Sequence, residues 1–348
     1  MPSSFSSIPT INYSRLRTPT TKAAELIKLR DAIFVVGFLY LVESGLEPLI
    51  KETHEALPWV FSLPTEVKEK SNMRNSPAFL GYTQLGSETT AAQTDLREQF
   101  DFGTPVEATT AVNEPQWKKL AGPSQFPANS EVESLVKQYL TGMHSLSRSF
   151  LQLVGESLSL PPTTFDGFLG DMDRLKFVKY PPAAPGSQGV GPHKDSTGLF
   201  TFLSQDNVGG LEVLNKDGDW IEVSPVEGSL VVNIQQGFEA ITGGICGATT
   251  HRVIAPTDVT RYSIPFFLGV RLDLTLDQLR ESAAHITAKI PVTDDRKKRA
   301  VDVPSEFLSP QYSCFGEAQL RNRVLSHPDV GKRWYPDLYE KYSNEVLR

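Results

Sequence analysis

The stretch GPHKDSTGLFTFLSQDNVGGLEVLNKDGDWIEV, residues 191–223, decides the fold of this chain. It contains short apolar runs that are separated by Gly, Asn and Asp at close intervals: Leu199–Leu203, Gly210–Leu214 and Trp220–Val223. Asp217-Gly218 is a hairpin signal, because glycine adopts the positive φ that a tight turn needs. Many short strands at this spacing are typical of a β-sandwich or a jelly roll.

The same pattern extends over residues 173–270. Further apolar runs occur at Leu175–Tyr180, Ser229–Ile234 and Tyr262–Leu268. Four phenylalanines fall in these runs: Phe200, Phe202, Phe266 and Phe267. Because successive side chains of a strand point to opposite faces, only half of these rings can face an interior pocket. We therefore predict a mainly β core with flanking helices.

His193 and Asp195 stand two positions apart, and residues i and i+2 of a strand point to the same face. The other histidine of the β-rich region, His251, follows 58 positions later (251 − 193). Two imidazoles and one carboxylate form the facial triad of non-haem iron(II) oxygenases, which leaves positions open for a cosubstrate and O₂. We expect the other histidines to have ordinary structural roles: His54, His144, His285 and His327.

Arg261 and Ser263 follow His251 closely, and strand alternation places both on one face. A guanidinium fork beside a hydroxyl suits a carboxylate. A 2-oxo acid that chelates iron through its keto acid end would place its far carboxylate here, with Tyr180 as a third donor. The sequence therefore predicts a carboxylate clamp near the metal site.

Taken together, these residues resemble the isopenicillin N synthase-like family of 2-oxoglutarate/Fe(II)-dependent dioxygenases. The motifs that carry the resemblance are His-x-Asp at 193–195, His-Arg-Val at 251–253 and Arg-x-Ser-x-Pro-Phe-Phe at 261–267. The resemblance covers nearly the whole chain. Gly37-Phe38, Gly81-Tyr82 and Asp95–Glu98 are similar to the family's N-terminal region, and Phe315–Glu317 and Ser326–Val330 are similar to its fungal branch.

The resemblance implies a distorted double-stranded β-helix, which is a jelly roll, together with Fe(II) and 2-oxoglutarate. The implied reaction hydroxylates, desaturates or cyclises a small molecule, a specialised metabolite given the fungal similarity, with release of succinate and CO₂. The implied site has three metal ligands, three cosubstrate contacts and one substrate contact: His193, Asp195 and His251; Arg261, Ser263 and Tyr180; and Phe267.

Two departures from the family pattern leave the cosubstrate open. Val178 stands where many plant members have Asn, and Gln235-Gln236 stand where many members have Gly-Asp; we interpret the glutamines as a variant turn. Isopenicillin N synthase holds its substrate's carboxylate with the equivalent clamp and consumes no 2-oxoglutarate, so an Fe(II) oxidase of that type is the main alternative. A non-catalytic jelly-roll binding protein would not need three metal ligands. A zinc hydrolase would need a general base beside the metal, and no such motif is present.

The flanking sequence predicts a mixed α/β N-terminal region, residues 1–130, packed on a catalytic region, residues 131–348, as one structural unit. Phe34–Val42 is rich in aromatic and branched residues, which favours a strand. Ser130–Glu133 has the sequence of a capping box, and the apolar residues that follow predict a long helix over residues 130–159. Helix-compatible sequence returns after residue 270.

The composition excludes several partners. The formal net charge of −7 gives no attraction to nucleic acid or anionic lipid. The longest apolar run, Ala32–Val42, is too short to span a bilayer. Cys246 and Cys314 cannot make a disulfide framework, and the first residues lack the pattern of a signal peptide. We expect a cytoplasmic monomer that acts on a small-molecule substrate with O₂.

Overall fold

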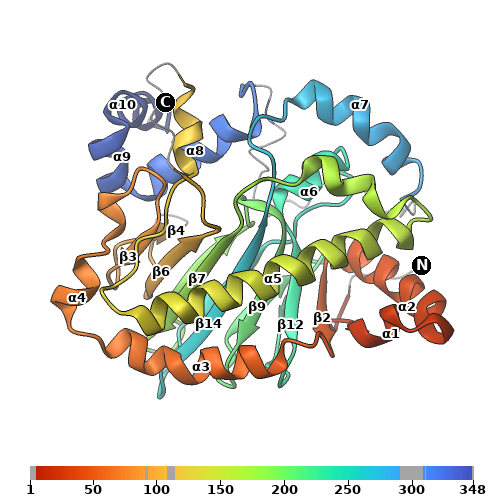
Figure 1. Cartoon of the computed structure of the whole chain (residues 1–348), viewed down its shortest axis with the longest axis horizontal. Coiled ribbons are helices and arrows are strands. Elements are labelled where there is room, and N and C mark those ends of the chain that lie inside the picture. The colour runs from red at the N-terminus through yellow and green to blue at the C-terminus, as the bar shows by residue number, and fades with distance from the viewer. Residues whose placement is uncertain (1–4, 91–92, 108–113, 291–308, 310, 347–348) are drawn as a thin grey trace.

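The computed structural model describes residues 5–90, 93–107, 114–290, 309 and 311–346 of the chain. Among these residues, the largest sheet has eight strands (Figure 1). Their order is β1 (Thr10–Asn12), β2 (Phe38–Val42), β12 (Leu230–Ile234), β9 (Gly198–Gln205), β14 (Arg261–Gly269), β7 (Arg174–Tyr180), β6 (Glu98–Gly103) and β3 (Gly81–Thr83). The sheet thus combines strands from both sides of residue 130, and only the β1–β2 pair among its ladders is parallel.

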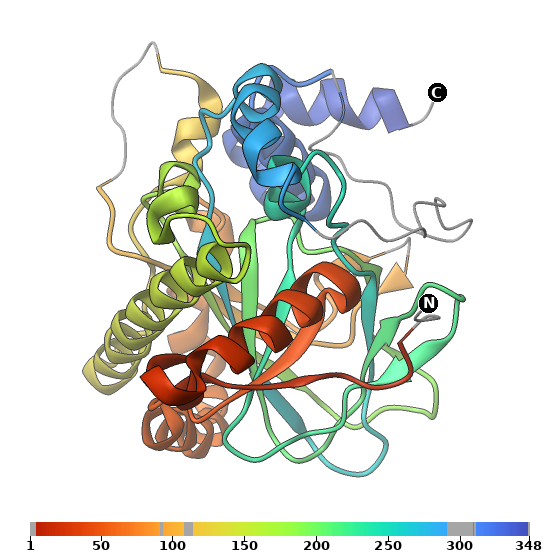
Figure 2. The same cartoon turned by 90° about the vertical axis from the view of Figure 1, so that its right-hand side faces the viewer.

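A smaller sheet faces the large one. Its strands are β11 (Trp220–Glu222), β10 (Leu211–Leu214), β13 (His251–Ile254) and β8 (Gln188–His193), and β4 (Thr89–Thr90) pairs separately with β5 (Gln93–Thr94). Figure 2 shows α5 (Ser130–Ser157) and the β10–β11 pair on opposite sides of the large sheet. The two facing sheets form the jelly-roll core with flanking helices that the sequence predicted.

The long helix α5 covers the outer face of the large sheet, with α3 (Glu47–Ser62) beside it (Figure 1). The ring of Phe150 on α5 packs against Phe200 and Phe202 on β9, with centroids 5.6 and 5.3 Å away. The predicted capping box is wrong, because the helix is capped one residue earlier. The side chain of Asn129 accepts hydrogen bonds from the backbone N–H groups of residues 131 and 132.

The predicted strand Phe34–Val42 is wrong in its first half. Residues 32–36 form a π-helical turn, η1 (Ala32–Val36), that continues α2 (Pro19–Asp31), and the strand begins at Phe38. Gly37 makes the change of direction with a φ of 81°, a conformation that glycine adopts at little cost. A short apolar run fits a buried helix turn and a buried strand equally well, so the pattern could not distinguish them.

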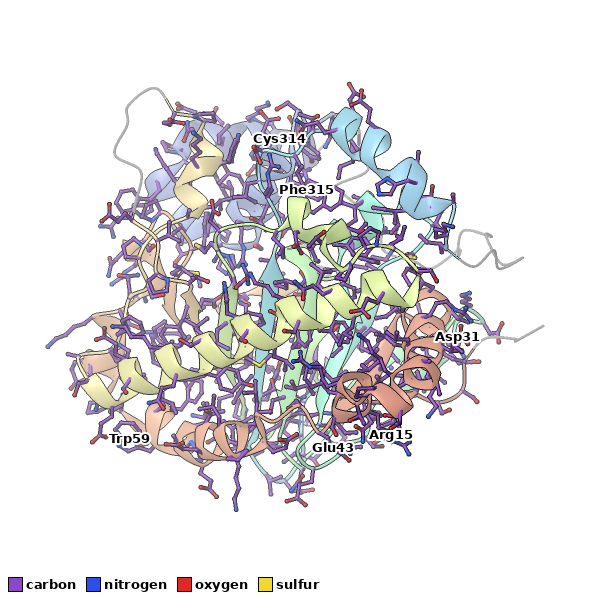
Figure 3. All side chains as sticks on the ribbon, turned by 45° about the vertical axis from the view of Figure 1, so that its right-hand side comes forward. Arg15, Asp31, Glu43, Trp59, Cys314 and Phe315 are labelled. Carbon is purple, nitrogen blue, oxygen red and sulfur yellow. The ribbon has the colours of Figure 1, made fainter. Side chains whose placement is uncertain are left out.

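The remaining helical segments surround the sheets. They are α1 (Tyr13–Arg17), α4 (Thr65–Glu69), α6 (Gln236–Ile241), α7 (Leu276–Thr287), α8 (Phe315–Ser326), α9 (Pro328–Trp334) and α10 (Pro336–Val346), with short 3₁₀ turns at η2 (Met73–Asn75), η3 (Gln116–Leu120) and η4 (Pro162–Phe168). Figure 3 labels Cys314 and Phe315 at the start of α8, where the Phe315 N–H donates to the Leu274 carbonyl over 3.0 Å. Among the described residues, no helix has both the length and the apolar character to cross a bilayer.

His54 on α3 gives the fold a specific pH dependence. Its Nε2 lies 2.6 Å from the Ser204 hydroxyl, and burial, with a smaller effect of the Arg261 charge, lowers its pKa to about 4. Below pH 6.5, the ordinary pKa of histidine, His54 therefore takes up a proton in the unfolded chain but stays neutral in the folded protein. Stability is lost as the pH falls from 6.5 towards 4, and at pH 4.5 this site accounts for about 2 kcal/mol.

The measurement is urea denaturation at pH 7 and pH 4.5. We expect His54→Gln to lose less stability between the two pH values than the wild-type protein, by about 2 kcal/mol. His285→Gln on α7, an exposed position, serves as the matched control and should follow the wild type. An unchanged pH dependence in His54→Gln would assign the acid sensitivity to other groups.

Candidate metal centre and active-site cavity

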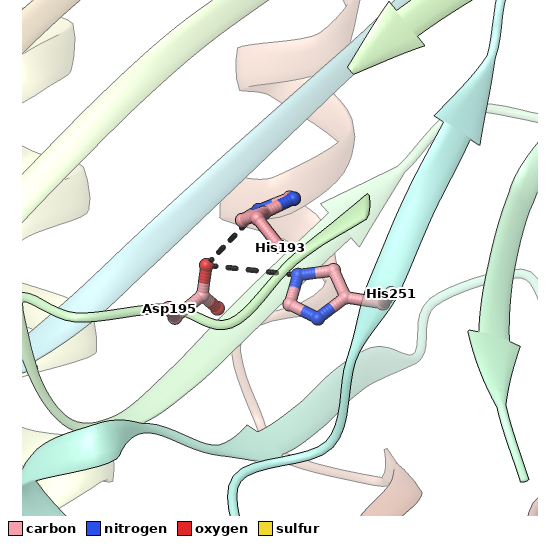
Figure 4. Close-up of side chains that lie close together, drawn as sticks. All are labelled: His193, Asp195 and His251. Carbon is pink, nitrogen blue, oxygen red and sulfur yellow. Dashed lines mark ion pairs between the residues drawn. The ribbon is translucent and has the colours of Figure 1, made fainter. Parts of the chain in front are cut away.

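Two strands of the smaller sheet bring the candidate metal ligands together. His193 is the last residue of β8 and His251 the first of β13, and the two are directly paired across the antiparallel ladder. Asp195 lies just beyond the end of β8 rather than on a strand, which differs from the prediction. It still points to the side of the two imidazoles, because the chain turns there towards β9 (Figure 4).

The three side chains converge on one point. The Nε2 atoms of His193 and His251 lie 3.4 and 3.6 Å from Oδ1 of Asp195 (Figure 4). One ligand atom from each residue falls within 4.8 Å of the others. Two metal–ligand bonds of about 2.1 Å would span about 3.0–3.4 Å at ordinary coordination angles. The geometry therefore fits one shared ion, and the His₂-carboxylate donor set suits Fe(II).

Each imidazole is oriented by a backbone carbonyl. Nδ1–H of His193 donates to the Gly191 carbonyl over 2.9 Å, and Nδ1–H of His251 donates to the Thr249 carbonyl over 3.0 Å. These contacts fix the tautomer, because a carbonyl oxygen only accepts. In the neutral form of each ring, Nε2 is thereby left with a lone pair directed at the shared point, as metal-binding histidines require.

The large sheet orients the carboxylate. Oδ2 of Asp195 accepts hydrogen bonds from the Thr201 hydroxyl and, over 3.0 Å, from the Asn233 amide. Thr201 on β9 and Asn233 on β12 are paired in register, so the two donors stand side by side. Oδ1 of Asp195 remains directed at the two imidazoles. The site thus has outer partners for all three candidate ligands.

Electrostatics favours the ionised carboxylate. Burial would raise the pKa of Asp195, but the His251 charge and the hydrogen bonds from both histidines hold the pKa well below its ordinary value. Burial would lower the pKa of His251, and the Asp195 carboxylate raises it instead. A proton on His251 occupies the position that a cation would take. The triad therefore holds one ionised carboxylate, with which a metal ion can pair.

The triad lies in the wall of a cavity of about 580 Å³ between the two sheets. Every residue that the sequence predicted for the site lines this cavity: Tyr180, His193, Asp195, His251, Arg261, Ser263 and Phe267. The volume is in the usual range for small-molecule sites. Of the four phenylalanines considered from the sequence, only Phe267 lines it, whereas Phe200, Phe202 and Phe266 lie in the core beneath α5.

Arg261 is fully buried and incompletely paired. Its Nη2 donates to Oε1 of Gln205 over 3.3 Å, while Nε and Nη1 have no hydrogen-bond partner among the described residues. Its guanidinium carbon lies 4.8 Å from the ring centroid of Tyr180, so the tyrosine contacts the cation through its ring. Ser263 stands two residues further along β14 and is also buried. A buried guanidinium with free donors is costly unless an anion completes it, so this end of the cavity fits a carboxylate.

Comparison with known proteins extends from the site to the whole chain. Residues 8–129 match the family model of the non-haem dioxygenase in morphine synthesis N-terminal region, and residues 169–270 match that of the 2OG-Fe(II) oxygenase superfamily. The 2-oxoglutarate-dependent dioxygenase frbJ of Dothideomycetidae sp. is 39% identical over 347 residues, which cover 96% of this chain and 94% of frbJ. The chain belongs to the 2-oxoglutarate-dependent dioxygenases.

Other relatives agree with this assignment. A 2-oxoglutarate-dependent dioxygenase of Gibberella zeae is 36% identical over 371 residues, with 99% of this chain and 95% of the relative covered. The crystal structure of a putative 2OG-Fe(II) oxygenase family protein from Caulobacter crescentus superimposes with a TM-score of 0.69 at 25% identity, covering 92% of this chain and all of that chain (100%).

The family assignment confirms the predicted fold, oxidoreductase activity and cofactors. The dioxygenase uses Fe(II) and 2-oxoglutarate with O₂ on a small-molecule substrate, and the oxidase without 2-oxoglutarate is not supported.

The paired glutamines have separate positions in the dioxygenase. Oε1 of Gln235 accepts the backbone N–H groups of Thr197 and Gly198 over 3.0 and 2.7 Å, which fixes the turn after Asp195. Gln236 begins α6, and its backbone N–H donates to the Asp195 carbonyl over 2.9 Å. Gln235 therefore supports the interpretation as a variant turn. Gln236 also lines the cavity, so it adds a polar residue to the wall.

The sequence did not reveal a group of charged residues in the cavity wall. Arg97 and Glu88 come from the segment before β6, Lys176 from β7, and Arg323 and His327 from α8 and its end. Of the four histidines expected to have structural roles, His327 lines the cavity. Its Nε2 lies 2.6 Å from Oε1 of Glu88. The sequence analysis touched these positions only through two segments of family similarity, Asp95–Glu98 and Ser326–Val330. It assigned no function to either segment.

Proposed function

We propose that this dioxygenase oxidises a small specialised metabolite at an Fe(II) held by His193, Asp195 and His251. The observation that carries the proposal is the meeting of three ligand atoms within 4.8 Å in the wall of the cavity that also contains the incompletely paired Arg261. The fungal relatives support the choice of a specialised metabolite over a macromolecular substrate.

The chain's own residues have distinct tasks in this proposal. Arg261 and Ser263 bind the far carboxylate of 2-oxoglutarate, and the Tyr180 ring holds the guanidinium in place. Phe267 contacts the substrate, which keeps the target carbon near the metal and excludes water from the reaction. Bound Fe(II) would supply the redox chemistry by which O₂ oxidises 2-oxoglutarate to succinate and CO₂ and then the substrate.

Anaerobic reconstitution tests this function. Purified protein with one equivalent of Fe(II) should develop a weak visible charge-transfer band when 2-oxoglutarate is added. Admission of air should then yield succinate, slowly without substrate and faster with it. No band, or O₂ consumption without succinate, would contradict the proposed use of the clamp and return the oxidase alternative.

We also infer that the enzyme is a cytoplasmic monomer with no nucleic-acid or membrane partner. The net charge of −7 supports the absence of a nucleic-acid or anionic-membrane partner, because the protein repels polyanions. Light scattering after gel filtration tests the monomer. The division into residues 1–130 and 131–348 stays a prediction; limited proteolysis between the two regions tests it.

A further inference from the structure

The active-site cavity has a second group of cations at the end away from Arg261. Tyr180, Val178 and Lys176 alternate along β7 and all line the cavity, with Tyr180 beside Arg261. Tyr180 lies four residue steps after Lys176, which corresponds to about 13 Å along β7. The cavity is therefore cationic at both ends, with an apolar stretch at Val178 between them.

Arg323 completes this second cationic end. It lies on α8 and lines the cavity, and its Nη2 is 3.5 Å from the Thr197 hydroxyl. Thr197 follows Asp195 by two residues, so Arg323 stands close to the candidate metal centre. A substrate group bound here would hold the rest of a small molecule beside the metal.

Lys176 and Arg323 share one carboxylate oxygen. Nζ of Lys176 lies 2.8 Å from Oδ1 of Asp101, whereas Nη1 of Arg323 lies 4.0 Å from the same atom. Both cations are almost buried, with 9% and 8% of their surface exposed. Asp101 neutralises one of the two charges. The other remains in excess and faces the cavity, where a buried charge needs a counter-ion.

The neighbouring charged groups are arranged so that cations predominate in the cavity wall itself. Arg97 pairs with Glu88 and Asp95, and the two carboxylates also accept hydrogen bonds from Gln99, His327, Thr90 and Gln188. Arg174 on β7 lies outside the cavity lining and donates only to backbone carbonyls among the described residues. Of this cluster, the cavity lining contains three cations, Arg97, Lys176 and Arg323, and one carboxylate, Glu88, whereas Asp95 and Asp101 lie outside the lining.

We propose that the substrate carries a carboxylate that binds between Lys176 and Arg323. This inference rests on the proposed function, because it assumes that Arg261 is occupied by 2-oxoglutarate. Lys176 and Arg323 already share the Asp101 carboxylate, so the pair matches a monoanion better than a doubly charged phosphate. The guanidinium fork and the ammonium supply donors to both carboxylate oxygens, and Phe267 and Leu325 supply apolar walls for the remainder.

The test uses matched acid and amide probes on the anaerobic Fe(II)–2-oxoglutarate enzyme. The pairs are hexanoate and hexanamide, phenylacetate and phenylacetamide, and N-acetyl-leucine and N-acetyl-leucinamide. Thermal shift and the change in the visible band report binding. We expect at least one acid to bind at least 10-fold more tightly than its amide, because loss of a charge-assisted hydrogen bond costs about a factor of 10–100. The band persists if the acid does not displace 2-oxoglutarate from Arg261.

Variants connect this selectivity to Arg323. Arg323→Gln should lose the preference for the acid, Arg323→Lys should retain part of it, and both should keep the 2-oxoglutarate band. Arg321→Gln is the matched control, because Arg321 lies on the same helix outside the cavity lining. Unchanged acid selectivity in Arg323→Gln, amides that bind as well as acids, or no binding by any acid would each overturn the inference. Absence of the band in the wild type would instead count against the proposed function.

Discussion

Replacement of Asp195 by alanine is expected to abolish Fe(II) binding at stoichiometric metal and to reduce 2-oxoglutarate turnover to background. Oδ1 of Asp195 is the atom that both Nε2 atoms share, at 3.4 and 3.6 Å. Its removal leaves two neutral imidazoles without the charge that attracts the cation. Loss of an outer partner of a ligand typically costs about 10–100-fold in metal affinity, and loss of the ligand should cost more.

Iron content after desalting and succinate release measure this result. Asp258→Ala is the matched control, because Asp258 lies in an exposed turn and binds only the neighbouring Thr257 side chain among the described residues. Asp195→Asn provides a second variant that keeps an acceptor for the Thr201 hydroxyl while it removes the charge. Retention of iron and full turnover by Asp195→Ala would refute the assignment of this ligand.

The metal centre could be predicted because its signals are local. His193 and Asp195 are two residues apart, and a single ladder pair brings in His251. Arg261 and Ser263 share a face of β14 by strand alternation alone. For such residues the sequence spacing already contains most of the geometry. Phe267 follows the same rule, since it has the parity of Arg261 on that strand.

The second cationic end could not be predicted, because it depends on packing between distant segments. Lys176 and Asp101 meet through the pairing of β7 with β6, and Arg323 on α8 joins them from a position 147 residues after Lys176 (323 − 176 = 147). An isolated Lys or Arg in sequence is usually solvated. Only the register of β6 and the docking of α8 turn these residues towards the cavity.

The prediction of helix and strand boundaries failed where two local structures fit the same sequence pattern. Ser130 and Asn129 are both good helix caps, and the side chain that actually bonds the free N–H groups is that of Asn129. Ala32–Val36 is apolar enough for a strand, but it continues a helix and buries Ile33 and Phe34 in the core. In each case tertiary packing decided between alternatives of similar local energy.

Arg261→Met is expected to raise the KM for 2-oxoglutarate by about 10–100-fold, the cost of a lost charge-assisted pair. The physical reason is that Nε and Nη1 of Arg261 have no partner among the described residues, so a carboxylate would be their first. Arg261→Lys keeps a point charge but not the guanidinium fork, so its KM for 2-oxoglutarate should lie between those of the wild type and Arg261→Met. Arg271→Met, at an exposed arginine paired with Asp273, is the matched control.

Stability measurements separate a binding role from a structural one. Met in place of Arg261 removes a buried, incompletely paired charge, so the free protein should be no less stable and could gain stability. At 2-oxoglutarate concentrations of 100 times the wild-type Kd, binding should add about 2.7 kcal/mol to the wild type. With a 100-fold weaker Kd, the variant should gain only about 0.4 kcal/mol. These stabilities are measured by anaerobic urea titration with Fe(II). If 2-oxoglutarate stabilised both proteins equally, its carboxylate would bind elsewhere. If Arg261→Met raised the KM for the substrate but not for 2-oxoglutarate, Arg261 would be a substrate clamp.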